Sequence, residues 1–116
     1  MIFAQLGKPL ASGQASLSNA TLSATLFVTG ANGWLDLYTL HITSTDSAVN
    51  TVTVSDGTTT LTYYVGGNPG GNNVPVYDQC SVPVRFKKGA TVTVAAGAIS
   101  SGKTVQVLAR GLFSMT

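Results

Sequence analysis

The sequence predicts an all-β domain, an antiparallel β-sandwich with an extended N-terminal arm. Apolar and β-branched residues alternate with polar ones at a period of two, and no window has the period of an amphipathic helix. Turn residues separate these runs at intervals of about 8 to 12 residues, which is typical of a sandwich or barrel. The pattern leaves the strand order open between a jelly roll and an immunoglobulin-like arrangement.

The composition indicates a single core and an unusually neutral surface. The 116 residues are 44% hydrophobic and only 9% charged, whereas charged residues make up roughly 25% of ordinary globular domains. The polarity of the surface must come from Ser, Thr, Asn and Gly, and a neutral surface of this kind repels identical neighbouring molecules only weakly. The composition excludes a disordered chain and favours a component of an assembly.

The N-terminal residues 1–20 are expected to form an arm, and residues 21–116 the sandwich domain. Gly7, Pro9 and Gly13 interrupt this stretch, which has no sustained period. Its apolar residues need cover, and the arm could cross its own sandwich or lie on a neighbouring molecule. These residues are Ile2, Phe3, Leu6 and Leu10.

Two strands are expected next, separated by a Gly-Asn turn. Residues 21–29 alternate strictly, and residues 34–43 read as a central strand. The apolar faces predicted for these strands are Leu22, Ala24, Leu26 and Val28 in the first, and Tyr38, Leu40 and Ile42 in the second.

The strongest local prediction is a hairpin. Asp56-Gly57 stands between the alternating runs 51–55 and 59–65, and Gly accepts the positive φ of a tight turn. Tyr63 and Tyr64 should then point to opposite faces, so at least one of them is exposed or in an interface. A low-complexity loop, residues 66–73, follows this hairpin.

Three further segments complete the sandwich. Residues 74–86 form a long strand or a bent pair, because Pro83 favours an edge or a bulge. A short strand over residues 91–94 follows the Lys-Lys-Gly turn. In the last strand, residues 103–113, the pattern places Val105, Val107 and Ala109 on one face and Leu108 and Leu112 on the other.

No catalytic, metal-binding or cofactor-binding set is expected. The acids are four aspartates with no Glu, and their spacing suggests no carboxylate pair. Asp56 is explained by its turn, Asp46 by a polar loop and Asp36 by a strand edge. His41 and Cys80 are single residues of their kinds, too few for a metal site. We therefore expect a protein that is not an enzyme.

Charge and cysteine content also limit the partners. The six basic residues are spread out apart from Arg85, Lys87 and Lys88, and a nucleic-acid binder would have a basic stripe interleaved with aromatics. The cluster is either a solvated turn or a contact to an acidic partner. Because Cys80 is the only cysteine and the start lacks an export signal, we expect synthesis in the cytoplasm and no membrane partner.

The stretches TLHITSTDSAVNTVTVSDGTTTLTYYV and VPVRFKKGATVTVAAGAISSGKTVQVLARG, joined by a Gly-Asn loop, resemble small structural proteins of tailed bacteriophages. The resemblance covers residues 37–111 and implies a non-enzymatic virion protein, made in the host cytoplasm. It further implies a capsid decoration or cement protein that is commonly trimeric and binds the major capsid protein or another virion protein. No catalytic or cofactor residue follows from it.

This resemblance agrees with the composition, and we expect capsid or subunit contacts from two segments of the chain. The contacts would come from Ile2, Phe3, Leu6, Leu10, Arg85, Lys87 and Lys88. The alternative is a carbohydrate-binding or adhesion module on a virus or cell surface. Its site would combine exposed aromatic side chains with the loop of residues 66–73.

Overall fold

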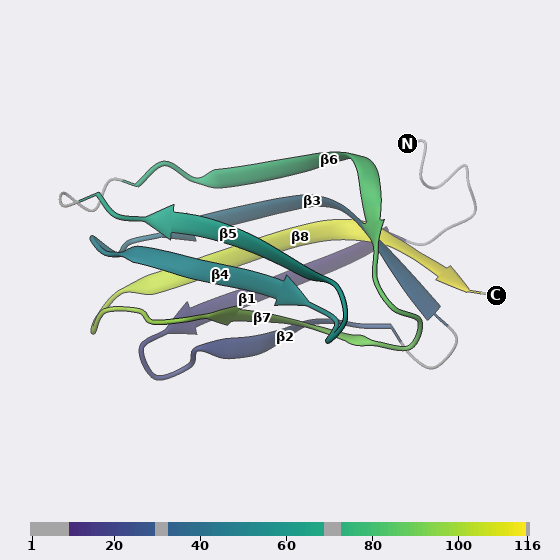
Figure 1. Ribbon diagram of the computed structural model, residues 1–116, viewed down its shortest axis with the longest axis horizontal. Coiled ribbons are helices and arrows are strands. Elements are labelled where there is room, and N and C mark those ends of the chain that lie inside the picture. Colours follow the sequence, from purple (N-terminus) through teal and green to yellow (C-terminus); the bar gives the residue numbers. More distant parts are fainter. Residues whose placement is uncertain (1–9, 30–32, 69–72, 116) are drawn as a thin grey trace.

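The computed structural model describes residues 10–29, 33–68 and 73–115, and all regular structure in them is β-strand (Figure 1). The strands are β1 (Leu10–Ser18), β2 (Ser23–Val28), β3 (Gly33–Ser44), β4 (Val49–Ser55), β5 (Thr60–Gly66), β6 (Val76–Arg85), β7 (Thr91–Ala96) and β8 (Thr104–Met115). The described residues contain no helix long and apolar enough to cross a membrane.

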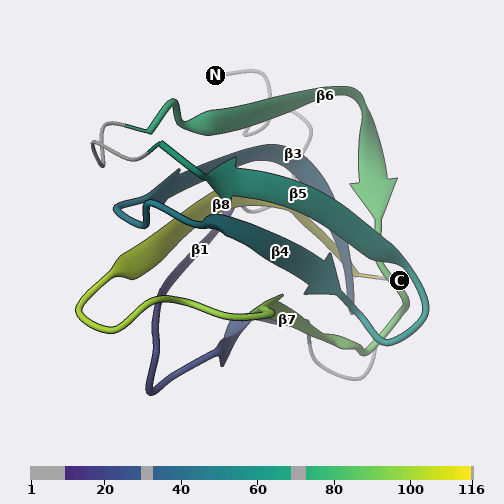
Figure 2. The same cartoon turned by 60° about the vertical axis from the view of Figure 1, so that its left-hand side comes forward.

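The strands form two antiparallel four-stranded sheets that face each other, seen as separate layers in Figure 2. Their orders are β1-β8-β3-β6 and β2-β7-β4-β5. The pairs are nested: β1 pairs with β8, β2 with β7, β3 with β6, and β4 with β5. The predicted β-sandwich is therefore confirmed. Nested pairing of eight strands in two sheets matches a jelly roll and differs from the immunoglobulin order.

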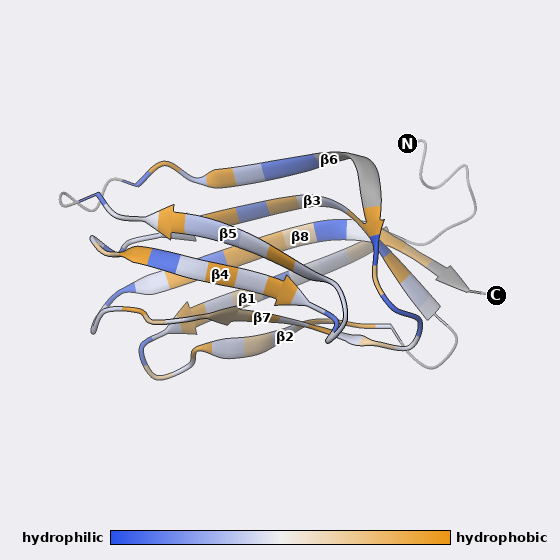
Figure 3. Cartoon of the chain, viewed as in Figure 1, coloured by the Kyte–Doolittle hydropathy of each residue, from blue (hydrophilic) through white to orange (hydrophobic). Residues whose placement is uncertain are grey.

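The core lies between the sheets and is almost entirely aliphatic. In β4, Val52 and Val54 point into the core, and the residues that alternate with them point outward. Orange and paler bands therefore alternate along β4 in Figure 3. The largest fully buried side chains are Phe86, Leu17, Leu35, Leu37, Leu40, Ile42, Leu112, Val52, Val54, Val92, Val94 and Val105. Burial of such side chains contributes most of the stability of a domain.

The predicted hairpin is confirmed in detail. Gly57 has a φ of 92°, and the Asp56 carboxylate accepts hydrogen bonds from the backbone N–H groups of Thr58 at 2.8 Å and Thr59 at 2.6 Å. The two tyrosines after the turn do point to opposite faces, since Tyr63 is half-buried and Tyr64 is 67% exposed. Asp56 is thus a turn residue, as its position in the sequence predicts.

The predicted arm is partly wrong, because residues 10–18 form β1. This strand pairs with β8 over its whole length, and Ala11, Gly13, Ala15 and Leu17 are buried on its inner face. These residues have the period of a strand, but three of them are too small to give a hydrophobic signal. Residues 1–9, which include Ile2, Phe3 and Leu6, lie outside the described residues.

Two β-bulges correct the predicted apolar faces. In β2 the register shifts between Thr25 and Phe27, so Leu26 and Phe27 are both buried while Val28 is 66% exposed. Leu22, before β2, is exposed as well. In β3 the register shifts around Tyr38, so odd-numbered residues are buried before it and even-numbered ones after it. A bulge adds one residue to one strand and reverses its alternation.

The second half of the chain agrees more closely with the sequence pattern. The expected bend appears in β6, whose pairing with β3 jumps from Gln79 to Val84, and Figure 1 shows the strand turning sharply. Val105, Val107 and Ala109 of β8 are buried as predicted. Leu108 and Leu112 differ from each other, because Leu108 is 48% exposed and Leu112 is fully buried.

One buried residue, Asp46, joins three loops at one end of the sandwich. Asp46 has no exposed surface, and its oxygens accept hydrogen bonds from the backbone N–H of Ala48 (3.0 Å), the Asn50 amide (2.9 Å) and the backbone N–H of Ser100 (2.8 Å). Asn73 donates to the Asp46 carbonyl at 2.9 Å. The β3–β4, β5–β6 and β7–β8 connections therefore meet at a single residue, the first and third through its carboxylate and the second through its backbone carbonyl. The sequence indicated Asp46 only as a polar loop residue.

Glycine is required at one position of the β3–β8 pair. A Cβ atom on Gly111 would lie 2.3 Å from the carbonyl oxygen of Asp36 and 3.3 Å from Cδ1 of Leu35. The first distance is far below van der Waals contact, and the atom it meets belongs to the backbone. Gly111 thus allows the strands to pair next to the Tyr38 bulge.

An edge contact holds the two sheets together where β5 and β6 meet. The Tyr63 hydroxyl of β5 donates a hydrogen bond to Asp78 of β6 at 2.6 Å. The bond joins the last strand of one sheet to the last strand of the other. Both groups are partly buried, so neither has free access to water as a substitute partner.

Replacing Tyr63 with Phe is expected to lower the free energy of unfolding by about 1 kcal/mol, because the ring stays and the hydrogen bond is lost. Tyr64→Phe is the matched control. Its ring is exposed on the opposite face of the same strand, and the expected change is within about 0.5 kcal/mol. Urea unfolding measures both values, and equal changes would contradict a role for the Tyr63–Asp78 bond.

Candidate interaction surfaces

Three surfaces of the described residues have features beyond those that the fold requires. The first is the Trp34 corner, formed by Trp34, Asp36, Arg85, Lys87 and Lys88. Arg85 bonds both oxygens of Asp36 through Nε (2.7 Å) and Nη2 (2.8 Å). The hydrogen bond to Asp36, and then its charge, raise the pKa of Arg85. The structure thus brings two predicted contact residues, Arg85 and Lys88, to one tryptophan ring.

The cations of the Trp34 corner are largely engaged within the chain. Arg85 lies 5.5 Å and the Lys88 ammonium 4.8 Å from the centre of the Trp34 ring, distances at which cations and aromatic rings attract each other. The backbone N–H of Lys87 donates to Asp56. Asp36, expected at a strand edge, is 5% exposed on an interior strand. The side chains of Lys87 and Lys88 are exposed.

The second surface is the hydroxyl face, the outer face of the β2-β7-β4-β5 sheet. None of these four strands contains a charged residue. Rows of hydroxyl side chains cross the strands, such as Thr25, Thr93, Ser55 and Thr60. Exposed apolar groups stand at its margins: Val28, Val49 and Tyr64, each more than 60% exposed.

The third surface is the His41 face, the outer face of the β1-β8-β3-β6 sheet. The pairing registers place Gln14, Leu108, His41 and Tyr77 in one row across all four strands. The rings of His41 and Tyr77 meet edge to face, with centroids 5.9 Å apart and an angle of 79°. Arg110 stands in the adjacent row, between Ser12 and Thr39.

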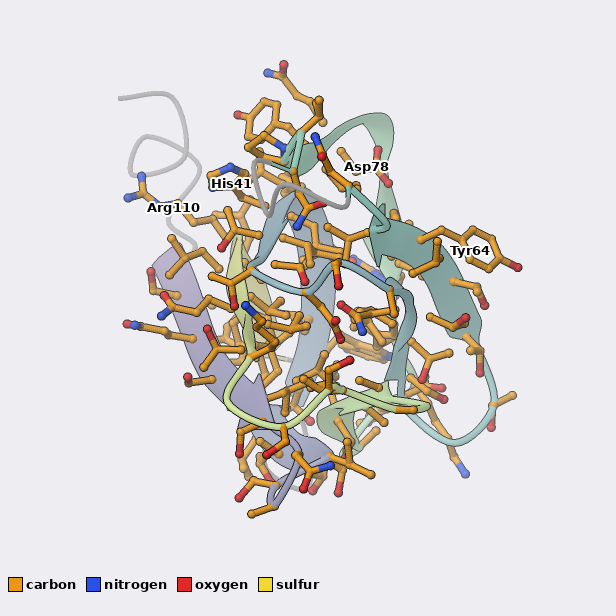
Figure 4. All side chains as sticks on the ribbon, turned by 90° about the vertical axis from the view of Figure 1, so that its left-hand side faces the viewer. His41, Tyr64, Asp78 and Arg110 are labelled. Atoms are coloured by element: carbon orange, nitrogen blue, oxygen red, sulfur yellow. The ribbon has the colours of Figure 1, made fainter. Side chains whose placement is uncertain are left out.

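Figure 4 shows His41 and Arg110 on the same side of the molecule and Tyr64 on the opposite side. Among the described residues, the two exposed tyrosines belong to different sheets and different surfaces, with Tyr64 in β5 and Tyr77 in β6. His41 was expected to be an exposed strand residue, and it is half-buried. Within the described part of the chain, no three His, Cys, Asp or Glu side chains come close enough to hold a metal ion.

Comparisons with known proteins give a fold but no family. No protein-family model matches the chain, and no curated protein is significantly similar to it in sequence. A chain from the capsid asymmetric unit of cyanophage Pam1 is similar in structure, with a TM-score of 0.53 and 14% identity over 90% of this chain and 84% of the other.

Two more solved structures have the same architecture. A chain of the acid-stable capsid of Helicobacter pylori bacteriophage KHP30 has a TM-score of 0.52 and 9% identity, over 90% of this chain and 86% of the other. The Drosophila NLP core, described in terms of pentamer formation and histone binding, has a TM-score of 0.50 and 15% identity, over 89% and 97%. At these identities the likeness extends to the fold alone.

Proposed function

We propose that this chain is a structural protein of a bacteriophage particle, and more narrowly a decoration or cement protein that binds the shell and reinforces it. The likeness to two phage capsid chains over most of their lengths supports the broader role. The resemblance in residues 37–111 to small phage structural proteins supports the narrower one. The proposal assigns no reaction to the chain.

The observation that carries this proposal is the hydroxyl face. A sheet surface without charge can lie against a neighbour without burying unpaired charges, and burial of an unpaired charge is costly. Threonine and serine hydroxyls both donate and accept hydrogen bonds, so they can pair with groups of either kind. Exposed Val28, Val49 and Tyr64 add apolar contact area at the margins.

The partners in this proposal are the major capsid protein or another virion protein, together with further copies of the chain. We expect a closed homo-oligomer, with a trimer as the favoured form, and light scattering of the purified protein measures its mass. The arm residues Ile2, Phe3 and Leu6, together with Lys87 and Lys88, remain the proposed contacts outside the hydroxyl face.

The test is quantitative mass spectrometry of purified particles of the phage that encodes the chain. A copy number that follows the symmetry of the shell would support the proposal, and absence from the particles would refute it. Deleting the gene separates the narrower roles. Particles that form but break at lower temperature indicate a cement protein, whereas failure to form shells indicates a shell-building subunit.

A pair of charges on the hydroxyl face is expected to reduce incorporation into particles by at least about tenfold, because two lysines would become buried without partners. Thr53→Lys with Thr62→Lys places them on paired positions of β4 and β5. Ser16→Lys with Gln106→Lys, paired and exposed on β1 and β8, is the matched control. Incorporation is measured by mass spectrometry of purified particles, and equal loss in both double variants would argue against this face as the contact.

A further inference from the structure

We propose that the His41 face binds a carboxylate-bearing sugar, with Arg110 on the carboxylate and Tyr77 under the pyranose ring. This site is on the opposite sheet from the hydroxyl face, so it does not depend on the virion role. It also differs from the carbohydrate site that the sequence suggested, which included the loop of residues 66–73.

The proposal rests first on the charge of Arg110. The strands of this sheet contain four charged residues, and three of them have partners. Asp36 and Arg85 bond each other, and Asp78 accepts a hydrogen bond from the Tyr63 hydroxyl. Arg110 has no ion pair with any described residue. An exposed guanidinium in a neutral surrounding favours an anion, and its planar donors match a carboxylate in two-bond geometry.

The second step is the shape beside this charge. An open hollow of about 210 Å³ lies on β1 and β8, lined by Ser12, Gly13, Gln14, Leu108, Ala109 and Arg110. Its walls combine an apolar side chain with hydroxyl, amide and guanidinium groups. Small-molecule sites have this combination of an apolar contact with a few placed polar groups. The volume suits one sugar ring rather than a larger ligand.

The third step is the aromatic platform next to the hollow. Tyr77 is 63% exposed although it stands in the middle of a sheet face, and its edge contact with His41 orients the ring. Tyr77 and Leu108 flank His41 in the same row. Neighbouring strands are about 4.8 Å apart, so Tyr77 stands two strands, or roughly 10 Å, from Leu108. An aromatic face offers apolar contact to the C–H face of a pyranose.

Neutral hydrogen-bonding groups surround these anchors. Gln14, Gln79 and Gln106 provide amides, and Ser12, Thr39 and Thr43 provide hydroxyls, all from the same outer face. Sugar hydroxyls need partners that both donate and accept, and amides and hydroxyls supply both functions. The chemistry fits a uronic acid as well as a sialic acid, because both are pyranoses that carry a carboxylate.

The experiment is a titration of the isotope-labelled full chain followed by backbone NMR shifts. The probes are methyl glucuronoside, the methyl glycoside of N-acetylneuraminic acid, and neutral methyl glucoside. We expect saturable shifts in β8 and β6 with at least one acidic sugar, at a dissociation constant on the order of 1 mM. Methyl glucoside should bind about tenfold more weakly, because it lacks the carboxylate.

Two pairs of variants make the test specific. Arg110→Gln should remove the preference for the acidic sugar, whereas Lys103→Gln, which removes an exposed charge from the β7–β8 turn, should keep it. Tyr77→Ala should weaken binding of all three sugars about tenfold, and Tyr64→Ala on the other sheet should leave it unchanged.

The possible outcomes differ clearly. Binding of only one acidic sugar supports the site and shows whether its ligand is a uronic acid or a sialic acid. Equal binding of the neutral sugar, absence of any saturable shift, or equal loss in Tyr64→Ala and Tyr77→Ala would each overturn the proposal. Each of these failures leaves the particle measurement unaffected, so the two proposals fail separately.

Discussion

Replacing Asp46 with Ala is expected to lower the free energy of unfolding by about 3 kcal/mol, a large part of the stability of a small domain. The substitution leaves the N–H groups of Ala48 and Ser100 without this acceptor, and it removes one partner of the Asn50 amide, which is buried. Because these donors come from two different connections, the loss should loosen the whole loop end. Urea unfolding at neutral pH measures the effect.

Ser47→Ala is the matched control for this substitution. Ser47 is the next residue in the same loop and its side chain is exposed, so the expected change is within about 0.5 kcal/mol. If Asp46→Ala were no more destabilising than Ser47→Ala, the buried network would not hold the loops together.

The same carboxylate should make stability depend on pH in the acid range. Hydrogen bonds from the N–H of Ser100, the amide of Asn50 and the N–H of Ala48 hold the pKa of Asp46 well below its usual value of 3.8. A lowered pKa in the folded state stabilises the protein above the unfolded-state pKa, and this contribution is lost as pH falls below it. Unfolding midpoints should fall more steeply below about pH 4 in the native chain than in Asp46→Asn, which cannot ionise there.

Replacing Gly111 with Ala is expected to destabilise the protein by about 3 kcal/mol, because a Cβ atom would overlap the carbonyl oxygen of Asp36. Neither atom is at the end of a flexible side chain, so the two strands must separate. The strain would fall on the central β3–β8 pair and, through Asp36, on its ion pair with Arg85.

Gly97→Ala is the control and should have the opposite sign. A Cβ atom on Gly97 would meet nothing within 4 Å, and the alanine restricts the unfolded chain, so a gain of about 0.5 kcal/mol is expected. Thermal and urea unfolding of the two variants measure both effects. A Gly111→Ala protein as stable as the native chain would show that the close approach can relax at little cost.

Features set by neighbouring residues could be predicted from the sequence. The Asp56-Gly57 turn, the buried faces of β4 and β7, and the opposite orientation of Tyr63 and Tyr64 all follow from residues within one turn or strand. The neutral surface also follows from composition, although the concentration of uncharged residues in one sheet does not.

Features set by distant residues could not be predicted in this way. The bulges at Leu26 and Tyr38 come from pairing with other strands, and they reverse an alternation that looks regular in the sequence. Asp46 receives one of its hydrogen bonds from Ser100, 54 positions along the chain. β1 was missed because Ala and Gly fill positions where the other sheet is close, as a Cβ on Gly13 would lie 2.7 Å from the Leu26 carbonyl oxygen.

The nested pairing has a consequence for synthesis on the ribosome. β1 is made well before its partner β8, with six other strands between them in the chain. Among the eight described strands, β4 and β5 are the only pair of neighbours in the chain that are hydrogen-bonded to each other, and contacts between distant segments form slowly. Until β8 is made, the first sheet lacks the strand that lies between β1 and β3. The newly made chain therefore exposes unpaired strand edges until β8 is made, and β1, which contains no charged residue, has little electrostatic protection against other chains.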